Sequence, residues 1–158
     1  MLLNRQEVFA SLSGKRLIPR IQALYAENGS PITLLHGAVF SDPAAPEAVT
    51  FYVRGNFLGS GLDVADAAKA RPVQVPVIRY ADLTARHPHD VLLMDIEGAE
   101  RDFLRHADLS GVRLIIAEFH RKIYGREGMR DCRRMLAGHG FVMDSAASAL
   151  GVHVWRRG

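Results

Sequence analysis

The chain has 158 residues, 48% of them hydrophobic, and a formal net charge of +3 at pH 7. These values are typical of one soluble globular domain and exclude a disordered or fibrous protein. The basic residues are dispersed, apart from the pairs Arg133-Arg134 and Arg156-Arg157, and form no stripe interleaved with aromatic residues. We therefore expect no binding to nucleic acid.

Cysteine usage and apolar runs indicate the compartment. The single cysteine, Cys132, cannot form a disulfide within the chain, which favours a reducing environment. No apolar run reaches the roughly 20 residues of a membrane-spanning helix. The early charges Arg5 and Glu7 are unlike a signal peptide. We expect a cytoplasmic protein that makes no membrane contact and, because no linker interrupts the chain, a single domain over residues 1–158.

Two helical patterns begin the chain. Residues 1–14 have a loose helical pattern of apolar residues, whereas residues 17–26 have a clear apolar stripe. The second pattern stops at Asn28-Gly29, as a helix with a left-handed cap would. We predict a helix over each segment.

Three strands are predicted next. Residues 32–40 are interpreted as a buried strand and its exit, where the small Gly37 and Ala38 would let a flat ligand lie against the backbone, or would simply allow close packing. Residues 49–54 and 73–77 alternate apolar and polar side chains, which predicts an antiparallel pair. The glycine-rich loop 55–61 between them either covers a substrate or is a plain connection. A short helix is predicted over 81–86.

The segment Val91-Leu92-Leu93-Met94-Asp95-Ile96-Glu97-Gly98-Ala99-Glu100 is the most informative. Its four apolar residues predict a strand buried on both faces. Asp95 and Glu97 follow, Gly98 permits a tight turn, and residues 99–106 can form a helix. Since open α/β sheets bind ligands beyond the carboxyl ends of their strands, we expect chemistry at Asp95 and Glu97.

A second apolar run over residues 112–117 ends in Glu118-Phe119-His120. Two neighbouring parallel strands would bring Asp95, Glu97, Glu118 and His120 to one edge of the sheet. Two alternatives stay open. The acids before residue 99 cap the following helix, or the four side chains bind a divalent metal ion, which we rank lower.

The remainder is predicted as a loop over 121–128, a helix over 129–137, and two antiparallel strands over 141–144 and 152–155. No zinc-binding spacing and no Gly-x-Ser-x-Gly nucleophile motif occurs, so we expect neither a zinc site nor serine hydrolase chemistry.

Residues 91–100 (VLLMDIEGAE), followed by residues 115–120 (IIAEFH), resemble the signature of the FkbM family of S-adenosylmethionine-dependent methyltransferases. The resemblance covers roughly residues 16–156. It implies an α/β fold with a Rossmann-like (class I) methyltransferase sheet, mostly parallel with an antiparallel carboxyl-terminal hairpin. It also implies methyl transfer from S-adenosylmethionine to a hydroxyl oxygen of a small molecule or sugar.

The resemblance further implies roles for individual residues. Gly37, Ala38, Val39 and Asp95 would bind the cofactor, with Ala38 and Val39 near its adenine and Asp95 near its methionine end and the methyl group. Glu97 and His120 would lie near the acceptor. The catalytic residues would be Asp95, Glu97 and His120. A histidine or carboxylate within hydrogen-bond reach can take the proton that the acceptor hydroxyl loses.

The beginning of the chain departs from the family pattern. Family members have a first strand with a glycine-rich loop before the segment that aligns with Arg16, whereas residues 1–15 contain one glycine, Gly14. We therefore expect an amino-terminally truncated sheet in which strand 91–95 has an unpaired flank, unless a second copy of the chain completes it in a homodimer. The alternative function is a catalytically inactive module for binding or oligomerisation.

Overall fold

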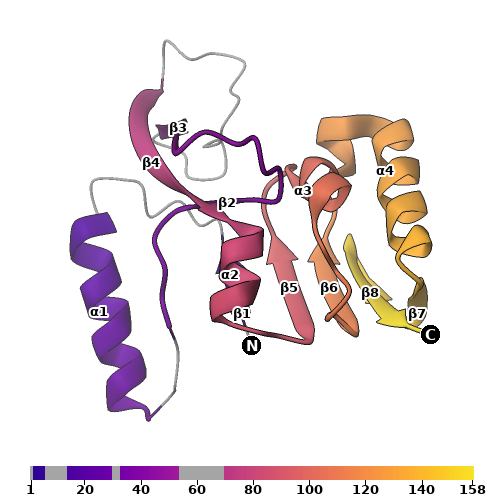
Figure 1. The fold of residues 1–158 in the computed structure, drawn as a ribbon, viewed down its shortest axis with the longest axis horizontal. Helices are drawn as coiled ribbons and strands as arrows, with labels where there is room; N and C mark the ends of the chain where they lie inside the picture. Colours follow the sequence, from indigo (N-terminus) through magenta and orange to yellow (C-terminus); the bar gives the residue numbers. More distant parts are fainter. Residues whose placement is uncertain (1, 6–13, 30–32, 54–69) are drawn as a thin grey trace. The chain divides into compact units, whose positions relative to one another are not determined.

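The computed structural model describes residues 2–5, 14–29, 33–53 and 70–158. The chain divides into two compact units, and each is described by itself. The first unit comprises Met1–Gln6, Val39–Ala45 and Ile78–Gly158, and the second comprises Glu7–Ala38 and Pro46–Val77. Figure 1 shows the elements in chain order.

The sheet of the first unit has the strand order β1-β5-β6-β8-β7. Strands β1 and β6 are parallel to β5, whereas β8 is antiparallel to both β6 and β7. The predicted carboxyl-terminal hairpin is therefore confirmed. The prediction of a mostly parallel sheet is wrong. The pairings β1–β5 and β5–β6 are parallel, but β6–β8 and β7–β8 are antiparallel. The strands span Leu2–Arg5 (β1), Val91–Asp95 (β5), Leu114–Glu118 (β6), Phe141–Ala149 (β7) and Val152–Arg157 (β8).

The first residues form a strand, not the predicted helix. Leu2 pairs with Leu92 and Arg5 with Asp95, so β1 occupies the flank of β5 that we expected to be unpaired. That expectation is wrong. An apolar run as short as Leu2-Leu3 fits the periodicity of a helix and that of a strand equally well, and pairing with a neighbouring strand decides which of the two forms. Residues 6–13 of the predicted helix lie outside the described residues.

Three helices belong to this unit: α2 (Tyr80–Arg86), α3 (Glu100–His106) and α4 (Arg121–Gly138). The first two confirm the predictions for 81–86 and 99–106. Helix α4 begins at Arg121, so the predicted loop over 121–128 is wrong. Gly125 (φ 68°, ψ −168°) has non-helical backbone and divides α4 at a kink into two helical segments. Figure 1 shows α3 and the first turn of α4 at the same end of the sheet, beyond β5 and β6.

The core of this unit lies between the sheet and its helices. Along β5, Leu92 and Met94 are buried while Val91 and Leu93 are only partly buried. The prediction of a strand buried on both faces thus holds fully for one face. The other core residues with the least exposed side chains come from the helices, β6 and the connecting segments: Tyr80, Leu104, Leu109, Ile115, Ala117, Cys132 and Leu136.

The second unit contains α1 (Gly14–Glu27), β3 (Ala48–Val53) and most of β4 (Arg71–Arg79). Gly29, at φ 63°, ends α1 as predicted. Strands β3 and β4 are antiparallel, with Phe51 opposite Val73, as predicted.

A short strand, β2 (Ala38–Phe40), replaces the predicted strand over 32–40. It joins β4 and β3 in a sheet of order β2-β4-β3. Residues 33–36 are irregular and Leu35 is exposed, so the prediction was wrong in extent, because apolar content alone does not pair a strand. Residue 32 and loop 55–61 lie outside the described residues.

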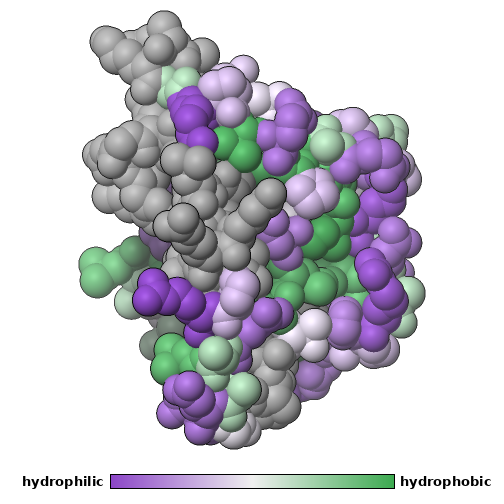
Figure 2. All heavy atoms as spheres, turned by 90° about the vertical axis from the view of Figure 1, so that its left-hand side faces the viewer, coloured by the Kyte–Doolittle hydropathy of each residue, from purple (hydrophilic) through white to green (hydrophobic). Residues whose placement is uncertain are grey.

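On the face drawn in Figure 2, hydrophobic and hydrophilic residues are mixed. In the part of the chain that the structure describes, no helix has both the length and the apolar character needed to span a bilayer.

Candidate active site

The carboxyl end of β5 is a tight turn that carries two acidic side chains. Ile96 is 2% exposed and anchors the turn in the core, while Asp95 and Glu97 on either side of it are exposed. Glu97 (φ 52°) and Gly98 (φ 102°) both have left-handed backbone. That conformation is costly for a glutamate, so the turn is held by its surroundings.

Beyond the neighbouring strand β6, accessible and buried side chains also alternate. Glu118 is its last residue, Phe119 is buried, and His120 immediately precedes α4. The backbone N–H of Phe119 donates to the carbonyl oxygen of Gly151 at 3.1 Å. Anchored by Phe119, Glu118 and His120 keep partly exposed side chains.

The two strand ends meet at His120. Its Nε2 lies 3.2 Å from Oε2 of Glu97, and its Nδ1 lies 2.9 Å from Oε1 of Glu100. The backbone N–H of Gly98 donates to the same Oε1 at 3.0 Å. The structure therefore brings together Glu97 and His120, two of the three residues predicted to be catalytic.

The third, Asp95, lies close to the same imidazole. One ligand atom each of Asp95, Glu118 and His120 lies within 4.8 Å of the others. Two carboxylates with an imidazole are a donor set that could hold a divalent cation, the option ranked lower from sequence. Glu97 contacts His120 instead. The alternative that acids before residue 99 cap α3 is not confirmed, because the N-cap residue is Ala99 and no side chain bonds there.

The charges at this edge are strongly coupled. Burial raises the pKa of Glu97, with Asp95, Glu118 and Glu100 adding to the rise and His120 opposing it. Burial also disfavours the charged form of His120, but the carboxylates of Glu100, Glu97 and Glu118 outweigh it and raise the pKa of the imidazole. The edge therefore has a surplus of negative charge, which favours a positively charged ligand.

Sequence reasoning missed Glu100. It received no role in the sequence analysis, whereas the structure buries its side chain completely. A signal was present: Glu100 lies at helical spacing from Phe103, Leu104 and Ala107, all of which face the core. An acid on the apolar stripe of a helix is the pattern that identifies it.

Tyr124 is the second residue that was missed. Its hydroxyl and Oε2 of Glu100 are both buried. Burial, followed by the charge of Glu100, raises the pKa of this phenol. Tyr124 thus stays neutral beside the buried carboxylate.

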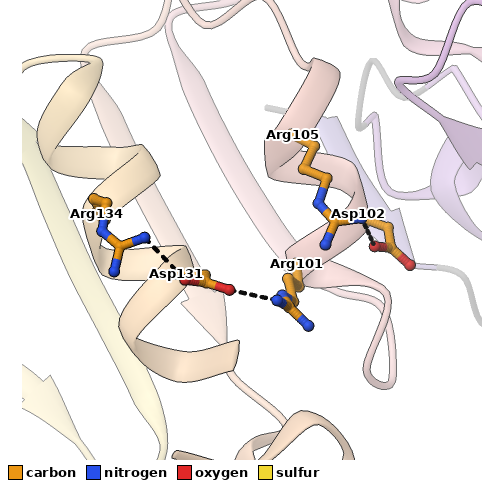
Figure 3. Close-up of polar contacts among 5 residues, drawn as sticks. All are labelled: Arg101, Asp102, Arg105, Asp131 and Arg134. Atoms are coloured by element: carbon orange, nitrogen blue, oxygen red, sulfur yellow. Dashed lines mark hydrogen bonds and ion pairs between the residues drawn. The ribbon is translucent and has the colours of Figure 1, made fainter. Parts of the chain in front are cut away.

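One ion pair joins helices α3 and α4. Figure 3 shows Asp131 of α4 between Arg134 of the same helix and Arg101 of α3. The Arg134 contact is 3.2 Å and lies at the surface, whereas Arg101 and Asp131 are partly buried. The pair joins α3, which begins at Glu100, to α4, which begins next to His120.

The predicted adenine-binding residues lie at the start of β2. Ala38 and Val39 are 5% and 7% exposed, and Gly37 is half-buried. Gly37 and Ala38 belong to the second unit, whereas Val39 and Asp95 belong to the first. Their role as a cofactor site stays a prediction.

Residues 19–143 match the model of a protein family described as the methyltransferase FkbM domain. Searches among curated proteins and among solved structures found no match. The matched range contains β5, β6, α3 and α4, and with them every side chain that contacts His120 in the arrangement above.

Proposed function

Because this chain belongs to the FkbM methyltransferase family, we propose that it transfers a methyl group from S-adenosylmethionine to a hydroxyl oxygen of a small molecule or sugar. The observation that supports this most is the contact between His120 Nε2 and Glu97 Oε2 at the carboxyl edge of parallel strands, beside Asp95. A proton acceptor and an acidic edge are what such a transfer needs from the protein.

The negative charge at this edge is complementary to the charge of the methyl donor. S-adenosylmethionine carries a positive sulfonium and a positive ammonium group, and the carboxylates of Asp95, Glu97 and Glu118 provide complementary charge. When bound, it supplies an electrophilic methyl group on a sulfur that retains the electron pair of the broken carbon–sulfur bond. Within the first unit, we assign Asp95 to its methionine end and Val39 to its adenine.

The residues of the chain act on the acceptor. The hydroxyl loses its proton as its oxygen bonds to the methyl carbon, and His120 takes that proton on Nε2. Glu97 lies against the same nitrogen and stabilises the imidazolium that results. Most of the remaining rate enhancement comes from holding the two reactants in line.

The proposal includes the fold. We assign the parallel strands β1, β5 and β6 with the antiparallel pair β8 and β7 to the Rossmann-like class of methyltransferase sheets. In such sheets the ligand lies beyond the carboxyl ends of the parallel strands, which is where Asp95 and His120 are found.

Production of S-adenosylhomocysteine in the presence of a panel of sugars and small alcohols tests the activity. The variant His120→Gln should lower kcat by roughly 100-fold or more while leaving the affinity for S-adenosylmethionine nearly unchanged. His106→Gln, an exposed histidine at the end of α3, is the matched control. Equal turnover by both variants would remove His120 as the base.

A further inference from the structure

Glu100 is the one charged residue that the described part of the chain buries completely. Taking a carboxylate out of water costs several kcal/mol unless specific partners compensate, and an apolar residue at a merely structural position would avoid that cost. Its neighbours on the same helical stripe, Phe103 and Leu104, are apolar. The position therefore has a requirement beyond packing.

The contacts of Glu100 show what that requirement is. Its Oε1 lies 2.9 Å from Nδ1 of His120 and also accepts the backbone N–H of Gly98 at 3.0 Å. A carboxylate oxygen accepts the N–H of the ring nitrogen that it faces, so Glu100 favours the hydrogen on Nδ1 and Glu97 favours it on Nε2. The contact of Glu100 is the shorter one and its side chain is fully buried, whereas the side chain of Glu97 is 45% exposed and can turn to water, so Glu100 decides the position of the hydrogen. The lone pair is then on Nε2.

The two sides of the imidazole ring face different surroundings. The Nδ1 side meets Glu100, which is sealed from solvent with Tyr124 beside it. The Nε2 side meets Glu97, whose side chain is 45% exposed. The nitrogen with the lone pair is thus the one on the open side.

We propose that Glu100 is a positioning residue that fixes His120 in the Nδ1–H tautomer, so that Nε2 faces the acceptor as the proton-accepting atom. The inference rests on the proposed function for its purpose, but the tautomer itself is a property of the chain without any ligand. Glu97 assists at Nε2, and Glu100 determines which nitrogen is available there.

Nitrogen-15 NMR of the full chain, at a pH where His120 is neutral, tests the proposal directly. A protonated ring nitrogen resonates well upfield of an unprotonated one, and the signals are assigned by their loss in His120→Asn. We expect His120 of the wild type to have its hydrogen on Nδ1. A hydrogen found mainly on Nε2 would overturn the proposal.

Two variants separate positioning from general folding. In Glu100→Gln the amide oxygen can still accept from Nδ1 and from Gly98, so the Nδ1–H tautomer should persist. In Glu100→Ala the acceptor is absent and the preference for this tautomer should be lost. The matched control Glu97→Gln changes the other contact of the ring and should leave the tautomer unchanged.

The outcomes for the two proposals are distinct. If Glu100→Ala does not fold, Glu100→Gln and the wild type still decide, because a shift to the Nε2–H tautomer in either contradicts the role of Glu100. An Nδ1–H tautomer in a chain that does not bind S-adenosylmethionine would leave the positioning role intact and reject the methyl transfer.

Discussion

The imidazole of His120 contacts the carboxylates of Glu97 and Glu100, so its pKa should reflect their charges. The charges of Glu100, Glu97 and Glu118 raise its pKa despite burial, whereas burial and Arg133 lower the pKa of His153. An NMR titration of both imidazoles, with a chelator present, should find His120 losing its proton at the higher pH. Titration of His120 at or below the pH of His153 would contradict this charge coupling.

The raised pKa also has a consequence for stability. Since the folded value lies above the unfolded one, the protonated His120 stabilises the fold fully below about pH 6.5, and this contribution disappears as pH rises through the folded pKa. The loss of unfolding free energy in His120→Gln should therefore be larger at about pH 6 than at about pH 9. Denaturant unfolding at the two pH values measures it, and a pH-independent loss would exclude the linkage.

Gly98 is required by the turn for two reasons. Its φ of 102° is unfavourable for any side chain, and an added Cβ would lie 2.5 Å from Cδ1 of Ile123. Gly98→Ala should lower the free energy of unfolding by about 1–3 kcal/mol. Gly138→Ala is the control, because Gly138 lacks a positive φ and a Cβ there meets nothing within 4 Å. Similar effects of both substitutions on chemical denaturation would show that the turn tolerates a side chain.

At the level of single residues, the sequence predicted the side chains that follow strands directly. Asp95, Glu97, Glu118 and His120 come within reach of one another because parallel neighbours end at one edge. Glu100 and Tyr124 were missed because both lie on helices, and their contact depends on how those helices pack. Chain position alone does not contain that information.

Helices α3 and α4 are joined by a pair of charges with little solvent around it. A double-mutant cycle on Arg101 and Asp131 should give a coupling energy on the order of 1 kcal/mol or more. The exposed pair Arg105–Asp102 within α3 is the control and should give only about 0.2–0.5 kcal/mol. A coupling for Arg101–Asp131 no larger than the control would mean that the pair does not fix α3 against α4.

Elements with one dominant signal were predicted well. Strands β5 and β6 follow from uninterrupted apolar runs, and α1 from an apolar stripe that ends at a left-handed glycine. Elements that depend on a partner were not. Strand β1 exists by pairing with β5, and the helical segment that begins at Arg121 was missed because residues 121–128 contain two glycines, which have low helix propensity.

For the whole molecule, the family resemblance predicted more than the patterns did. The match over residues 19–143 confirms the family, while the sheet is mixed and has β1 on the flank of β5. The two compact units each have their own strands, and the acidic edge lies entirely within the first. The charge at that edge is the basis of the proposed binding of a cationic methyl donor.

Titration calorimetry with S-adenosylmethionine tests the proposed activity most directly. We expect the wild-type chain to bind, and Asp95→Ala to weaken binding by roughly tenfold or more, since a hydrogen bond to a charged group is lost. Asp82→Ala, an exposed acid on α2, should bind like the wild type. No heat from the wild type at millimolar ligand, or equal affinity in both variants, would contradict a methyl-donor site at the end of β5.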